Sequence, residues 1–297
     1  FKQKTAYEML RSLVGSEMCI RDRVRIEVDL HVILTIGEYA FKRIMTGWFL
    51  RVFIGAAILL VGILFIGNPD PQQGLLSHRT LALSIMSGAA VLLVIVMGAT
   101  EIPRDIDTRV IMIILSKPLT KADVVVGKFI GLILVAAFTV FCLTAACALG
   151  CLAQKFVTPE ITKGYGFDVN MLQKAVFAFF EAVIVAGVVI FLSTRLSEIP
   201  IIFFSGFYLA LGYLIMYLPI LLGHQKLQNL HWFARWPVQG IYYLVPNLWY
   251  LQIPPQDAEL GTVPWLHLFL AVVYAMLYAV LFVALAIKSF EGRQVAG

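Results

Sequence analysis

The sequence predicts an all-α, polytopic membrane protein with six transmembrane helices, and two observations carry this prediction. Hydrophobic residues make up 60% of the 297 residues and charged residues only 14%, whereas a soluble domain carries about 25% charged residues. Six apolar segments are close to the roughly 20 residues that a helix needs to cross a hydrocarbon core of about 30 Å. The predicted spans are residues 48–66, 81–102, 129–152, 175–193, 200–222 and 265–287.

The chain before the first span has two parts. Residues 1–23 lack the apolar core of a signal peptide and resemble translated sequencing-adapter read-through, so we expect a non-native or disordered arm, with an ordinary cytosolic arm as the alternative. Residues 24–297 form the predicted six-span domain. Within it, residues 31–47 have apolar side chains at helical spacing, which favours an interfacial helix with its apolar face toward the membrane. We expect it to bend at Gly47; a plain cytosolic extension of the first span is the alternative.

Lys and Arg residues orient the spans, because cytosolic loops are enriched in them. With the N-terminus in the cytosol, the inner segments from residue 24 onward hold twelve Lys and Arg residues and the outer loops hold six. We therefore expect both termini in the cytosol. The net charge of +5 is spread between apolar runs, without the clustered basic face of a nucleic-acid binder, so no nucleic-acid partner is predicted.

The loop between the second and third spans is the most informative part of the sequence. Pro103 suits the first turn of a helix, and Lys117-Pro118 ends that helix, because the residue before a proline avoids the helical region. Apolar and charged residues fall on separate helical faces. The loop therefore predicts a short amphipathic helix, suited to pass the movement of a cytosolic partner to two spans. The apolar face holds Ile106, Val110, Ile113 and Ile114, and the charged face holds Arg104, Asp105, Asp107 and Arg109.

The third span is preceded by a start signal, and two small residues lie at its beginning. Thr120 and Asp123 have the spacing of a capping box. Gly127 and Gly131, one helical turn apart, permit close helix packing, and we expect Lys128 at the lipid headgroups. Gly127-Lys128 is not part of a phosphate-binding loop, because the first glycine and the final hydroxyl of the pattern G-x-x-x-x-G-K-[ST] are missing.

In this loop the sequence resembles the signature of ABC type-2 permeases, in a branch that includes permeases linked to multi-copper enzyme maturation. The resemblance is motif-specific here and extends in topology over most of the chain. The pattern consists of Glu-Ile-x-Arg, a Thr, Leu-Ser-Lys-Pro and Gly-Lys-Phe-x-Gly. Its positions in this sequence are Glu101, Ile102, Arg104, Thr108, Leu115, Ser116, Lys117, Pro118, Gly127, Lys128, Phe129 and Gly131.

The resemblance implies the membrane-spanning subunit of an ABC exporter in a bacterial inner (plasma) membrane. It implies that a separate ABC ATPase subunit binds beneath the loop and the interfacial helix, and that a second permease, identical or different, completes the transporter among the membrane lipids. ATP and Mg would bind to the ATPase, so no cofactor is expected on this chain. The substrate would be lipophilic or amphipathic. The residues implied to couple to the ATPase are Glu101, Arg104, Asp105, Thr108, Arg109, Lys117 and Pro118.

Two other functions are open at this point. The chain could transmit conformational changes of the ATPase to the bilayer or to an extracytoplasmic partner without transport. An intramembrane enzyme is a more distant alternative. The sequence has no catalytic motif or metal-ligand spacing, so we predict neither a catalytic residue nor a metal site. Glu181 lies within the fourth span. An intramembrane carboxylate is a candidate functional site, and a hydrogen bond to a neighbouring helix is the competing interpretation.

The predicted orientation can be tested by labelling single introduced cysteines with a membrane-impermeant maleimide. In right-side-out vesicles, Arg109→Cys and Lys121→Cys should react only after the membrane is permeabilised, because both lie in the predicted inner loop. Lys226→Cys, in a predicted outer loop, should react in intact vesicles. Reaction of either inner position in intact vesicles would invert the topology.

Overall fold

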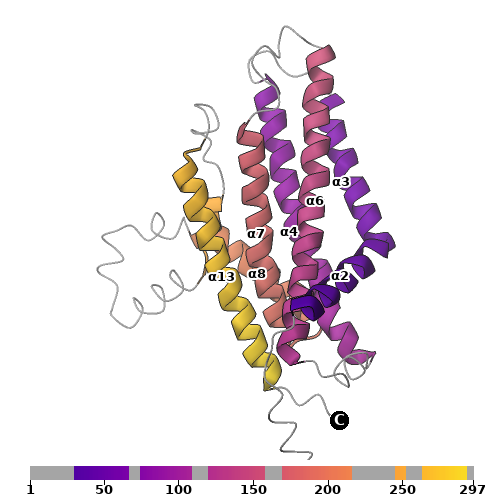
Figure 1. Ribbon diagram of the computed structural model, residues 1–297. Coiled ribbons are helices and arrows are strands. Elements are labelled where there is room, and N and C mark those ends of the chain that lie inside the picture. Colours follow the sequence, from indigo (N-terminus) through magenta and orange to yellow (C-terminus); the bar gives the residue numbers. More distant parts are fainter. Residues whose placement is uncertain are drawn as a thin grey trace, which may run out of the picture.

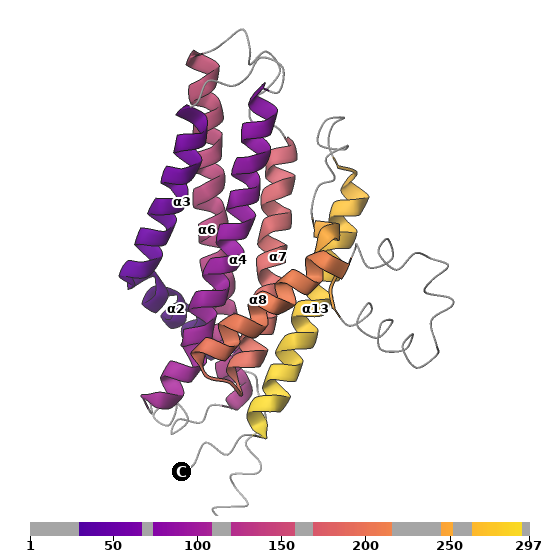
Figure 2. The same ribbon diagram turned by 180° about the vertical axis from the view of Figure 1, so that it is seen from behind.

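The computed structural model describes residues 30–66, 74–108, 120–157, 169–215, 245–251 and 263–292. These residues form an all-helical bundle without β-strands among them, which confirms the predicted fold class. Four long helices and α3 run side by side, α2 lies across the lower end of α6, and α8 crosses the bundle diagonally (Figure 1 and Figure 2). The helices are α2 (Leu30–Thr46), α3 (Trp48–Ile66), α4 (Gly74–Asp107), α6 (Lys121–Val157), α7 (Val169–Ser193), α8 (Glu198–Leu214), the 3-10 helix η2 (Leu248–Leu251) and α13 (Trp265–Glu291).

The described helices supply four or five membrane spans. By length and apolar composition, α4, α6, α7 and α13 can each cross a membrane. The helices α2 and α3 qualify as a pair that is bent by 67°, and the break lies at Gly47, as expected. The helix α8 has 17 residues, fewer than the roughly 20 needed to cross the bilayer. The predicted fifth span continues to residue 222, outside the described residues, so the count of six stays a prediction.

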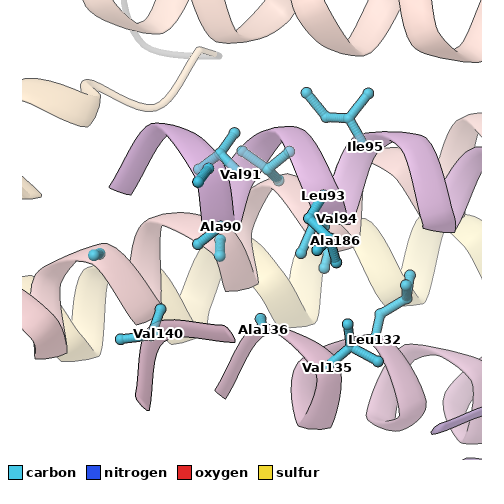
Figure 3. Close-up of a cluster of buried hydrophobic side chains, with 14 of the residues drawn as sticks. Ala90, Val91, Leu93, Val94, Ile95, Leu132, Val135, Ala136, Val140 and Ala186 are labelled. Atoms are coloured by element: carbon cyan, nitrogen blue, oxygen red, sulfur yellow. The ribbon is translucent and has the colours of Figure 1, made fainter. Parts of the chain in front are cut away.

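The apolar core lies where α4, α6 and α7 meet. Figure 3 shows side chains of α4 and α6 packed against each other and against Ala186 of α7. Large apolar side chains also cover the outside of the bundle; on α13, Leu266, Phe269 and Leu277 are largely exposed. A surface this apolar suits a bilayer and would be a liability in water.

Small residues bring α2 against the start of α6. A Cβ atom added to Gly131 would lie 2.7 Å from the Cβ of Ala40 and 3.0 Å from the carbonyl oxygen of Gly37. A Cβ atom added to Gly127 would lie 2.7 Å from the Cβ of Ile36. These distances are shorter than van der Waals contact, so a larger residue at either glycine would have to displace α2.

The buried face of α2 points at α6. Ile33, Gly37, Ala40 and Ile44 are its buried residues, and α2 packs mainly on α6. We expected this apolar face to lie on the membrane, and that detail is wrong, because the glycines of α6 offer it a closer protein surface. Exposed apolar side chains on α2, such as Leu34, are left for the membrane surface.

The helix α4 continues through Pro103 to Asp107, so the prediction that Pro103 begins a separate helix is wrong. Proline removes one backbone donor. The helix nevertheless persists, because Glu101 and Asp105, on either side of the proline and one turn apart, bind the same two basic side chains. The second half of the predicted amphipathic helix, residues 109–119, lies outside the described residues.

The predicted capping box at the start of α6 is confirmed. The Thr120 main-chain N–H donates to Asp123 Oδ2 at 2.9 Å, and the Asp123 N–H donates to Thr120 Oγ1 at 3.2 Å. These bonds satisfy backbone groups that have no partner within the helix, so α6 has a defined starting point before the membrane.

The glycine contact predicts a stability difference between two substitutions. Gly131→Val should lower the free energy of unfolding by about 1–3 kcal/mol, because the added side chain overpacks the contact with α2. Gly88→Ala, on α4, is the control, since no described residue lies within 4 Å of the added methyl group; it should be neutral or slightly stabilising. Thermal unfolding of the purified protein in detergent measures both, and equal melting temperatures would contradict the contact.

Candidate functional site

Four charged side chains from three helices form a closed cluster where α2 crosses α6, at the lower end of the bundle in Figure 1. Arg43 of α2 donates from Nη1 to Asp105 Oδ1 at 2.6 Å and from Nη2 to Glu101 Oε1 at 3.1 Å. Lys128 Nζ of α6 donates to Glu101 Oε2 at 3.1 Å and to the main-chain oxygen of Glu101 at 2.9 Å. Lys128 also pairs with Asp105. We call these four residues the charge cluster.

The charge cluster is balanced and mostly inaccessible to solvent. The side chains of Glu101 and Lys128 are 4% exposed and that of Asp105 is 3% exposed, while that of Arg43 is 24% exposed. A buried charge is tolerated when it is paired and hydrogen-bonded, and removal of one partner leaves the other uncompensated. The helices α2, α4 and α6 therefore cannot separate here without exposing unpaired charges, and the cluster acts as a joint.

The local sequences of α4 and α6 place their charged residues where these can pair with each other and with Arg43. On α4, Glu101 and Asp105 are one turn apart and so share a face. On α6, Lys128 follows Gly127, one of the two glycines that admit α2. The close approach of α2 then brings Arg43 within reach of both carboxylates. Helix packing through small residues and ion pairing thus depend on each other.

The predicted coupling residues fall into three groups. Glu101 and Asp105 are buried in the charge cluster, whereas Arg104 and Thr108 are exposed at the end of α4. Thr108 Oγ1 donates to the main-chain oxygen of Arg104 at 2.7 Å, which closes the last turn of the helix. The other three, Arg109, Lys117 and Pro118, lie outside the described residues.

The structure corrects two expectations, one for Asp105 and one for Lys128. Asp105 does not share the exposed charged face with Arg104, because it lies one turn after Glu101 and turns to the same partners. Lys128 does not extend to the lipid headgroups, because its ammonium group is held between the two carboxylates. The sequence analysis missed Arg43. The signal that could have found it is the pair of acidic residues at the end of an apolar helix, which requires basic partners.

A second polar contact joins helix ends at the same end of the bundle. Lys121 Nζ donates to the main-chain oxygens of Phe290 and Glu291, at 3.4 and 3.2 Å. Arg195 Nε, in the turn after α7, donates to Ser289 Oγ at 2.9 Å. Cations near the C-terminus of a helix are favourable because they complement its dipole. The end of α13 is therefore fixed beside the start of α6 and the end of α7.

Glu181 is buried in α7 and accepts a hydrogen bond from the hydroxyl of Tyr213 in α8. This is the hydrogen bond to a neighbouring helix that we weighed as the competing interpretation. Within the part of the chain that the structure describes, no three His, Cys, Asp or Glu side chains gather in a group that could hold a metal ion. The charge cluster is the candidate functional site, because it joins four charged side chains from three helices.

Comparison with known proteins gives one match. A protein-family model described as "ABC-2 family transporter protein" matches residues 2–295. A search of curated proteins found no match. The matched stretch includes every described helix and all four residues of the charge cluster.

The buried pairing predicts a large effect for one lysine and a small effect for another. Lys128→Met leaves Glu101 and Asp105 with Arg43 alone, and loss of one partner from a buried ion pair costs about 3–5 kcal/mol. Lys42→Met is the control, because the Lys42–Glu38 pair, 2.6 Å apart, is exposed; such pairs contribute little. Thermal unfolding in detergent compares the two, and similar melting temperatures would show that the cluster does not hold the helices together.

Proposed function

Because the chain belongs to the ABC-2 family of transporter proteins, we propose that it is the permease subunit of an ABC exporter driven by a separate ATPase. It is a multi-pass membrane protein of a transporter family. In this proposal ATP and Mg bind to the partner ATPase, and a second permease, identical or different, completes the transporter in a bacterial inner membrane. The proposed substrate is lipophilic or amphipathic.

The observation that carries the proposal is the charge cluster. It ties α2 and the start of α6 to the end of α4. The loop residues 109–119 follow this point in the sequence and lie outside the described residues. A force applied to α2 or to the loop therefore acts on two long helices together, because the three elements are held by buried ion pairs. A subunit that converts ATPase closure into movement of its spans needs such a joint.

Exposed charges lie on both elements that the cluster joins. Arg104 and Asp107 are exposed at the end of α4, and Glu38 and Lys42 are exposed on α2. Charged surface residues favour recognition and orientation of a soluble partner more than they add raw affinity. They support a docking surface for the ATPase beside the joint.

Close packing supports the onward path of the movement. The helix α4 packs along α7, and α6 packs on both. Protein interiors are packed as densely as organic crystals, so they transmit displacement with little loss. A shift of the joint would thus reach α7 through the core drawn in Figure 3.

The proposal predicts that a charge reversal at Arg104 uncouples the permease from its ATPase. Arg104→Glu should insert and fold normally, because the residue is exposed. It should weaken stimulation of the ATPase about tenfold, because a loss of about 1.4 kcal/mol of binding free energy at a docking charge lowers the affinity by that factor. Arg79→Glu, in the opposite end region of α4, is the control. ATP hydrolysis and ATP-dependent uptake of a fluorescent amphipath are measured in inverted vesicles containing both subunits. Unchanged activity in Arg104→Glu would refute the docking assignment.

A further inference from the structure

We propose that Gln173 and Glu181 of α7 are positioning residues that fix α8, η2 and the start of α13 to α7. The part of the bundle away from the charge cluster would then follow α7 as one body. For its consequence in transport this inference rests on the proposed function. The anchoring itself is a property of this chain alone.

Gln173 holds the start of α13 with two hydrogen bonds. Its Nε2 donates to the main-chain oxygen of Val263 at 2.9 Å, and its Oε1 accepts from the Val263 N–H at 3.1 Å. Gln173 is 1% exposed. Val263 directly precedes Pro264, the N-cap of α13. A side-chain amide bound at both its donor and its acceptor fixes the direction as well as the position of the backbone it meets.

Glu181 holds the end of α8. Its carboxylate accepts a hydrogen bond from the hydroxyl of Tyr213, which is the residue before the last of α8. Glu181 is 2% exposed. In an apolar interior a buried polar group without a partner is costly, so this bond resists separation of α8 from α7.

The short helix η2 fills the space between these two anchors. Leu248 and Leu251 are fully buried in a cluster that includes Phe177 and Ile184 of α7. Gly212 of α8 is required by this contact, because a Cβ atom there would lie 2.7 Å from Leu248 Cδ1. Figure 2 shows α8 running diagonally across the bundle to end beside η2 and α13.

The contacts of α7 with these elements lie along one face, and its contacts with α4 lie on another. Gln173, Phe177, Glu181 and Ile184 are spaced at helical intervals that place them on one side. Ala186, Val189 and Ile190 belong to the separate core shared with α4 and α6. A displacement that reaches α7 from α4 would therefore be passed through residues 173–184 to the end of α8, η2 and the start of α13.

Hydrogen–deuterium exchange of the purified permease in detergent tests the anchors without any partner. Tyr213→Phe and Glu181→Leu should speed exchange of α8's last two turns and of residues 245–251 about tenfold, the effect expected for loss of one buried hydrogen bond. Gln173→Leu should do the same for residues 245–251 and the first turn of α13. Tyr208→Phe is the matched control, because its buried hydroxyl has no hydrogen-bond partner among the residues that the structure describes. Exchange in α2 should stay unchanged in all variants, which shows that they fold.

The conservative variant Glu181→Gln separates an anchor from a charge. Its side chain still accepts from Tyr213, so exchange should match the parent protein. Exchange as fast as in Glu181→Leu would overturn the anchor, because the negative charge of Glu181, and not its hydrogen bond, would then be what matters. Equal exchange in Tyr213→Phe and Tyr208→Phe would also overturn it.

In vesicles with the ATPase, Tyr213→Phe should keep ATP hydrolysis and lose most uptake; parent-like uptake would refute the role in transport. A parent protein inactive with every ATPase would refute the proposed function, while the exchange result would still decide the anchoring.

Discussion

Two carboxylates one turn apart cannot be buried at the end of an apolar helix unless basic groups come to them. In this protein that requirement determines how α2, α4 and α6 meet. Glu101 and Asp105 take one cation from each of the neighbouring helices, Arg43 and Lys128. The glycines beside Lys128 make room for α2, and without that room Arg43 would not reach the acids. The rest of the lower bundle follows from satisfying these charges.

The helices of the bundle are held by two kinds of polar contact. The lower end uses full charges, in the cluster and at the end of α13, where Lys121 meets free carbonyl groups. Away from this end, Gln173 and Tyr213 make hydrogen bonds in which one or both groups are neutral. Between them the core of α4, α6 and α7 consists of apolar side chains. Directional contacts thus fix the helices at particular points, and densely packed apolar side chains connect them.

The sequence predicted what depends on local pattern. Apolar length predicted the helices, and α3 has the predicted bounds, Trp48–Ile66; the Thr120–Asp123 spacing predicted the start of α6. It failed where a distant partner decides the outcome. Pro103 was expected to begin a helix, but the acids on either side of it are bound by residues far away in the chain. Arg43 and Gln173 carry no local signal of their roles, because their partners lie far away in the sequence.

The charge cluster also affects the stability of α4 around Pro103. Lacking an N–H, it leaves the carbonyl of Ala99 without the donor that a regular helix would supply, so the bending stiffness of α4 is lowest at this turn. Glu101 and Asp105 lie on either side of that compliant turn and bind the same two cations. The ion pairs therefore reinforce α4 at the turn where proline removes a backbone hydrogen bond.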